Sequence, residues 1–243
     1  MTTKVLSVGG SIIAPDTPDT EFLSAFTRMT TEWLMQNLDA RLIFVAGGGA
    51  PAREYQNAYR AVAENFSGPQ KDTASFPSED DENRACDWIG IMATRLNAQL
   101  LKTCYGPLCA QDVVTDPTQV TDFTGRVLVA AGWKPGFSTD NDAVLLAERF
   151  NADTVVNLSN IEKVYTDDPR RNPDARPLDT ISWADFRKIV GDEWVPGKNC
   201  PFDPIASRKA QELGLTVICA GGKNIENIRA ILNGKDYTGT TIR

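Results

Sequence analysis

The sequence predicts a mainly parallel α/β sheet, because segments typical of buried strands alternate with helical segments along the whole chain. Residues 4–8, 41–46 and 154–158 are short and mostly apolar, as expected of strands inside a sheet. Between the first two, residues 21–38 carry Phe22, Phe26 and other apolar residues at helical spacing. We therefore expect one sheet in which most neighbouring strands run parallel.

The same patterns predict the remaining elements. Pro51 stands where the first turn of a helix should be, and that helix is expected to run to about Asn65. Thr139 or Asp140 is the expected N-cap of a helix over 140–150. Residues 67–83 are rich in Ser, Pro, Asp and Glu, which predicts an exposed, mobile loop. We also expect helices over 84–103, 182–190, 203–213 and 224–232, and strands over 127–131, 216–219 and 240–242.

Composition narrows the class of protein. The chain has 243 residues, enough for one α/β domain or two small lobes. Its net charge is −7 and it has no Lys/Arg cluster, so we do not expect nucleic-acid binding. No apolar run approaches the ~20 residues that span a bilayer, and no signal-peptide pattern is present. Five cysteines without a C-x-x-C pair favour reduced thiols, and we expect a cytoplasmic protein with no membrane partner.

The chain contains no histidine. This removes the commonest general base and the commonest metal ligand, so it excludes Ser-His-Asp catalysis and His-ligated zinc sites. A reaction whose nucleophile is already ionised does not need such a base. The composition is therefore compatible with phosphoryl transfer onto a phosphate oxygen.

Two glycine motifs follow the first two expected strands. Gly9, Gly10 and Ser11 come directly after residues 4–8, and three glycines, 47–49, come after residues 41–46. Glycines let backbone N–H groups approach a phosphate, and the start of the following helix attracts anions. Arg53, one turn into that helix, can donate two hydrogen bonds to a phosphate. The alternatives are two tight turns and a surface arginine.

Three further polar sites follow later strands or lie on a helix. Asp87 can accept hydrogen bonds from ribose hydroxyls, although it can equally be a solvated helix residue. Ser138 to Asp140 can hold a phosphate and orient a cation, or simply cap a helix. Tyr165 can pack against a base or ribose, and Asp168 precedes Pro169 in a loop that can also be an ordinary turn.

Together these motifs resemble the archaeal-type uridylate (UMP) kinases of the amino acid kinase family. The motifs that carry the resemblance are GGS, GGG-x-x-x-R, D-x-x-G-I-x-x-T-R-x-N-A, P-G-x-S-T-D and S-N-x-x-x-V-Y-x-x-D-P, in this order. The resemblance implies a three-layer αβα fold and ATP-dependent phosphorylation of UMP to UDP in pyrimidine nucleotide synthesis. It also implies Mg²⁺ with ATP and a homo-oligomer, a hexamer built as a trimer of dimers.

The resemblance also implies a single domain over 1–243 and the residues of the site. Residues 1–150 would form the acceptor lobe and residues 151–243 the ATP lobe. For ATP it implies Gly9, Gly10, Ser11, Gly49, Arg53, Ser159, Asn160, Tyr165 and Asp168. For UMP it implies Gly48, Asp87, Trp133, Lys134, Pro135, Gly136, Phe137, Ser138 and Thr139. We expect the catalytic groups to be Asp140, Arg53 and Lys163. We expect no metal ligand from the protein, because Mg²⁺ would be carried by ATP.

The chain departs from the family pattern at several positions. Ser7 stands where many amino acid kinases carry a lysine, two residues before the first glycine pair. Lys163 replaces a glycine of the ATP loop, which would strain the backbone if that position needs a positive φ. Trp133 and Lys134 alter the acceptor loop, and the loop over 67–83 is longer than usual.

Two other readings remain open on the same fold. One is a non-catalytic nucleotide sensor or storage protein, and the departures from the family pattern at Ser7 and Lys163 favour it. The other is a kinase with a different small phosphate or carboxylate acceptor. Isopentenyl phosphate kinases and molybdenum storage proteins of this family use histidines, which this chain lacks.

We predict that Lys163 or Lys134 supplies the cation that Ser7 cannot, because phosphoryl transfer needs positive groups around the migrating phosphoryl. Replacing the responsible lysine with alanine should lower turnover at saturating substrate by at least about tenfold. Steady-state kinetics of both Lys→Ala variants check this, and wild-type turnover in both would show the hypothesis to be wrong.

Overall fold

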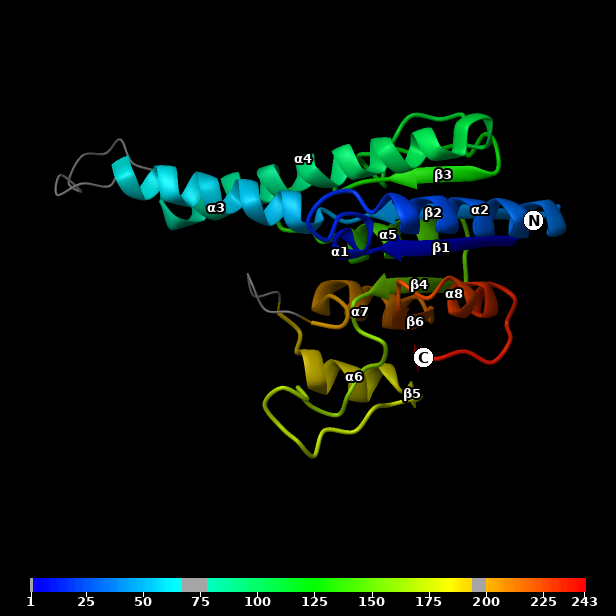
Figure 1. Ribbon diagram of the computed structural model, residues 1–243. Helices are drawn as coiled ribbons and strands as arrows, with labels where there is room; N and C mark the ends of the chain where they lie inside the picture. The colour runs from blue at the N-terminus through cyan, green and yellow to red at the C-terminus, as the bar shows by residue number, and fades with distance from the viewer. Residues whose placement is uncertain (1, 67–77, 194–199) are drawn as a thin grey trace.

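The computed structural model describes residues 2–66, 78–193 and 200–243, and its centre is a seven-stranded sheet in the order β3-β2-β1-β4-β6-β7-β5 (Figure 1). The strands β1 to β4 and β6 pair in parallel, and β5 also runs parallel to β7, whereas β7 pairs antiparallel with β6. This confirms the mainly parallel sheet. The strands are β1 (Thr2–Val8), β2 (Ala40–Ala46), β3 (Val127–Ala130), β4 (Thr154–Ser159), β5 (Thr180–Ile181), β6 (Thr216–Gly221) and β7 (Thr240–Ile242).

Helices cover both faces of the sheet. Successive residues of a strand point to opposite faces, so Val5 of β1 packs in one core and Leu6 in the other. The core around Leu6 contains α2, α4 and α8, and the core around Val5 contains α5, α6 and α7. This confirms the three-layer αβα fold. The helices are α1 (Gly10–Ile13), α2 (Thr20–Gln36), α3 (Gly49–Phe66), α4 (Glu79–Tyr105), α5 (Thr139–Arg149), α6 (Trp183–Val190), α7 (Pro204–Glu212) and α8 (Ile225–Leu232).

The register of the central strands brings their carboxyl ends to one level. Val8 at the end of β1 lies opposite Ala46 of β2 and Leu158 of β4. The loops that leave these three strands therefore begin side by side. Helices α3 and α4 extend together beyond this edge, on the left of Figure 1. An open α/β sheet binds ligands outside the carboxyl ends of its strands, so this edge is where a site is expected.

Three predictions about local structure need correction. Helix α5 has Ser138 as its N-cap, not Thr139 or Asp140, because the Ser138 Oγ accepts the N–H of Asn141 at 3.3 Å. Gly10 does not belong to a simple turn but begins the one-turn helix α1. The expected loop over 67–83 is too long, because α4 begins at Glu79. Ser78 and Asp81 cap each other there in a capping box, and residues 67–77 lie outside the described part.

Candidate active site

The two glycine loops pack against each other at the carboxyl edge of the sheet. A side-chain Cβ added to Gly10 would lie 1.9 Å from the backbone nitrogen of Gly49, which leaves no room for any residue but glycine. Gly49 itself has a φ of +71°, a left-handed conformation that glycine adopts at low cost. Each loop leads into a helix, α1 or α3. The N–H groups of Gly10, Ser11 and Gly49 at these starts make no hydrogen bond with another described residue, whereas Ala50 donates to the carbonyl of Ala14 and Pro51 has no N–H. The junction therefore offers backbone donors from two helix starts, which suits a phosphate.

Helix α4 fixes these loops through two buried polar side chains. The Asn97 amide donates from Nδ2 to the carbonyl oxygens of Gly47 and Gly48, at 2.8 and 3.1 Å. The Thr94 hydroxyl accepts the N–H of Gly132 at 2.8 Å, directly after β3. Thr94 and Asn97 are thus structural groups that hold the ends of β2 and β3 to α4.

The loop after β3, residues 132–138, is brought together with Asp87. One carboxylate oxygen of Asp87 accepts the N–H of Gly136 at 2.9 Å. The carbonyl of Trp133 accepts a hydrogen bond from Arg95 at 3.1 Å, and its N–H donates to Asp142 at 3.2 Å. Residues that the sequence assigned to one acceptor site therefore meet in space, although they lie more than forty positions apart.

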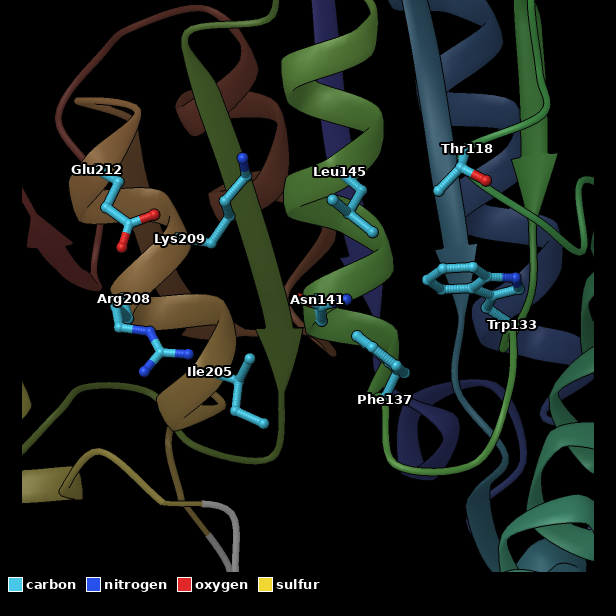
Figure 2. A pocket seen from close by; sticks show the side chains of 9 residues that line it. All are labelled: Thr118, Trp133, Phe137, Asn141, Leu145, Ile205, Arg208, Lys209 and Glu212. Carbon is cyan, nitrogen blue, oxygen red and sulfur yellow. The ribbon is translucent and has the colours of Figure 1, made fainter.

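The aromatic side chains of this loop line a separate groove over α5, with residues of α7 on one side and Thr118 and Trp133 on the other (Figure 2). The rings of Trp133 and Phe137 are 5.0 Å apart, and the Nζ of Lys134 lies 3.7 Å from the centre of the Trp133 ring. No residue of either glycine loop lines the groove, whose walls are Thr118, Trp133, Phe137, Asn141, Leu145, Ile205, Arg208, Lys209 and Glu212. Trp133 and Phe137 therefore face this groove, while their loop's backbone faces Asp87 and Asp142.

Two carboxyl groups in the first turn of α5 have raised pKa values. Burial, with the nearby Asp203 second, raises the pKa of Asp140 to about 6. Burial also raises the pKa of Asp142 to about 7. Among the described residues, the Asp142 carboxylate accepts one hydrogen bond, from the Trp133 N–H to Oδ2, and its Oδ1 has no partner. The hydroxyl of Ser7 donates to Asp140 Oδ1 at 3.0 Å, which acts in the opposite direction and lowers the Asp140 pKa.

The loop after β4 holds the residues assigned to ATP in local contacts. The Oγ of Ser159 accepts the N–H of Ile161 at 3.1 Å, and Tyr165 forms a β-bridge with Pro177. Asp168 accepts hydrogen bonds from Arg170, from both its backbone and its guanidinium. Asn160 is exposed. These residues follow the carboxyl end of β4, but in this structure Asp168 is engaged with its own turn.

The three expected cationic groups do not converge on one point. Lys163 forms an ion pair with Asp179, and Lys134 packs over Trp133. Arg53 is exposed on α3 and makes no hydrogen bond or ion pair with any other described residue. Lys163 does not have a positive φ, so the strain considered for this position is not present. The catalytic roles of these residues remain predictions.

Sequence reasoning missed two residues that build this edge. Asp203 caps α7 by accepting the N–H of Ala206 at 2.8 Å, and Asn157 of β4 donates to the carbonyl of Pro201 at 2.8 Å. The Asp-Pro pair at 203–204 is a recognisable helix start, with the capping residue before a proline at the first helical position. Asn157 has no comparable signal, since a polar residue inside an apolar strand does not indicate which group it will hydrogen-bond to.

Cys86, Cys104, Cys109 and Cys219 are free thiols, as predicted for them. Within the residues that the structure describes, no group of three or more His, Cys, Asp or Glu side chains could hold a metal ion. The helices of the described ranges include none that is long and apolar enough to cross a membrane.

The raised pKa of Asp142 predicts how stability depends on pH. A carboxyl whose pKa is raised by folding favours the folded state below its unfolded pKa of 3.8, and this contribution is lost as pH rises through about 7. Asp142→Asn removes the charge, so it should raise the free energy of unfolding by roughly 2 kcal/mol at pH 8 and by much less at pH 4. Thermal melts of both proteins at these two pH values measure this. Asp153→Asn, at an exposed position, is the control, and an equal effect of Asp142→Asn at both pH values would contradict the prediction.

Comparisons with known proteins agree with this geometry. Residues 2–221 match the sequence model of the amino acid kinase family. The chain is 33% identical to the uridylate kinase of Methanospirillum hungatei, covering 100% of this chain and 95% of that protein. It is 32% identical to the uridylate kinase of Pyrococcus abyssi, covering 98% of each.

Solved structures give the same result. The uridylate kinase of Archaeoglobus fulgidus matches with a TM-score of 0.79 and 31% identity, over 100% of both chains. The UMP kinase of Bacillus anthracis matches with a TM-score of 0.71 at 17% identity, over 100% of this chain and 96% of that one, which supports the fold alone. From the family match, the full-length relatives and the sheet edge with its two glycine loops, we conclude that this chain belongs to the amino acid kinase family.

Proposed function

We propose that the chain catalyses the ATP-dependent phosphorylation of UMP to UDP, a step of pyrimidine nucleotide synthesis. The observation that carries the proposal is the meeting of the two glycine loops, the 132–138 loop and Asp87 at one edge of the sheet. Such an edge suits phosphates and a ribose. The relatives that match over nearly their full length are uridylate kinases, and this supports UMP and ATP as the substrates.

The proposed acceptor site lies between the glycine loops and α4. The phosphate of UMP would lie at Gly48, with Asp87 accepting hydrogen bonds from the ribose and residues 133–139 enclosing the base. A phosphate oxygen of UMP is ionised at neutral pH, so it can attack without a general base. The absence of histidine is therefore compatible with this reaction.

The proposed ATP site uses the other side of the same junction. Gly9, Gly10, Ser11 and Gly49 would donate backbone N–H groups to the phosphates, and Arg53 would reach back to them from α3. Residues 159–168 would hold the nucleoside. On this proposal, residues 1–150 are the acceptor lobe and residues 151–243 the ATP lobe. Mg²⁺ would arrive with ATP, because it is usually bound through substrate phosphates and few protein carboxylates, and it would neutralise phosphate charge.

We also propose that the chain works as a homo-oligomer in the cytoplasm, a hexamer assembled as a trimer of dimers. In support, α4 exposes Trp88, Met92 and Leu96 with 41%, 58% and 68% of their surface accessible. Large apolar side chains grouped on one helix face are typical of protein interfaces. The free thiols of Cys86, Cys104, Cys109 and Cys219 are typical of a reducing compartment.

Light scattering coupled to size-exclusion chromatography checks the oligomer. We expect about six times the mass of one chain, and Met92→Glu should shift the mass towards smaller species because it places a charge in the apolar face. A monomeric wild-type protein would contradict the proposal.

The activity is tested by measuring ADP release with Mg-ATP against UMP, CMP, dUMP, AMP, GMP and small carboxylic acids. We expect turnover with UMP to exceed turnover with every other acceptor by at least about tenfold. No turnover with any acceptor, together with clear nucleotide binding, would indicate a nucleotide sensor. Preferred turnover of another acceptor would indicate a different kinase of the family.

The same assay tests the role of Asp87. Asp87→Asn should raise the KM for UMP by roughly tenfold, because a charged hydrogen-bond acceptor is lost, and should leave the KM for ATP unchanged. Asp80→Asn, at an exposed position on the same helix, is the matched control and should change neither constant. Equal effects of the two variants on the KM for UMP would show that Asp87 is not part of the acceptor site.

A further inference from the structure

Ser7 is a buried polar residue at the carboxyl end of β1, with 3% of its surface exposed. Its hydroxyl donates to Oδ1 of Asp140 at 3.0 Å, and the two residues lie 133 positions apart. A buried hydroxyl at the end of an apolar strand has few possible partners, so this hydrogen bond fixes both side chains.

The other oxygen of the same carboxylate reaches helix α7. Oδ2 of Asp140 accepts the backbone N–H of Asp203 at 3.3 Å. Asp203 is the N-cap of α7, where its own carboxylate accepts the N–H of Ala206 and its carbonyl accepts the hydroxyl of Ser207. Since Asp140 itself lies in the first turn of α5, one carboxylate connects β1, α5 and α7.

No cation holds Asp140 in place within the described part of the chain. Its neighbours are the carboxyl groups of Asp142 on α5 and Asp203 on α7, and the thiol of Cys219 on β6. No Lys or Arg of the described ranges forms an ion pair or hydrogen bond with it. The orientation of the carboxylate therefore depends on one hydroxyl and one backbone N–H.

We propose that Ser7 is a positioning residue for the phosphoryl transfer. Its hydroxyl orients the Asp140 carboxylate, which in turn holds the start of α7 against the end of β1. The start of α7 belongs to the proposed ATP lobe and β1 to the proposed acceptor lobe, so this bridge sets the distance between the two substrates. The inference rests on the proposed function, because it assigns the bridge a role in that reaction.

The first test compares wild type with Ser7→Ala at saturating UMP and ATP. We expect kcat to fall by roughly five- to tenfold, since substrate alignment degrades when one buried hydrogen bond is lost, while the KM for UMP changes little. Ser7→Thr keeps a hydroxyl and should restore most of the activity. Ser7→Cys fills the same space with a weak donor and serves as a second test if Ser7→Ala does not fold. Wild-type kcat in both Ser7→Ala and Ser7→Cys would overturn the proposal.

A pH profile separates positioning from a loss of packing. The Ser7 hydroxyl lowers the pKa of Asp140, so removing it should move the acid limb of kcat, expected near pH 6, to higher pH. Asp140→Asn has no charge to titrate and should lose this limb. A limb that persists in Asp140→Asn, or stays in place in Ser7→Ala, would overturn the proposal. Asn157→Ala, which removes a different buried hydrogen bond to the segment before α7, should leave the limb in place.

Hydrogen exchange provides a measurement that does not depend on activity. In Ser7→Ala the amides at the start of α7, including that of Asp203, should exchange at least about fivefold faster than in wild type. Ser24→Ala, on the exposed side of α2, is the control and should change nothing there. Unchanged exchange would overturn the bridge itself. If exchange is faster in Ser7→Ala but the wild-type protein does not phosphorylate UMP, the hydrogen-bonded bridge is confirmed and only the proposed function is refuted.

Discussion

The contact between Gly10 and Gly49 is the constraint on which the rest of the site depends. Two backbones approach so closely there that a single added carbon would overlap the nitrogen of Gly49. This contact sets α1 beside α3, so the backbone N–H groups of Gly10, Ser11 and Gly49 lie at the same edge of the sheet. Asn97 then reinforces it by binding the carbonyls of the second loop. The geometry of this edge thus follows from backbone packing more than from charged side chains.

The first turn of α5 shows the opposite principle, in which the fold tolerates unfavourable electrostatics. Asp142 is fully buried and Asp140 half-buried, with Asp203 nearby, and desolvation raises the pKa values of the first two towards neutrality. Both carboxylates accept hydrogen bonds that orient them, and Asp142 keeps one oxygen without a partner among the described residues. Groups that cost stability in this way are concentrated at functional sites. Their position beside the glycine junction agrees with that tendency.

The acceptor loop joins these two features. Its backbone is fixed to Asp87 on one side and to Asp142 on the other, while Trp133 and Phe137 line the groove over α5. The backbone of the loop and its aromatic side chains therefore have different partners. This separation explains how the change to Trp133 and Lys134 is accommodated without disturbing the backbone hydrogen bonds of the loop.

Much of the fold was predictable because the signals are local. Alternating apolar segments predicted the parallel sheet and most helices to within a few residues, and glycines after β1 and β2 predicted the two loops. The errors were also local, since the Ser78 and Asp81 capping box extended α4 into the expected loop and Ser138 took the N-cap of α5. Residue types alone excluded histidine chemistry.

Tertiary structure decided which polar groups meet. The sequence determined that Ser7, Asp140 and Asp203 are polar residues near strand or helix ends, but each lies far from the others along the chain. Only the order of the strands and the packing of α5 and α7 bring them into one hydrogen-bonded bridge. The physical reason is that periodicity and capping act over a few residues, whereas a buried hydrogen bond depends on three-dimensional position that no local pattern encodes.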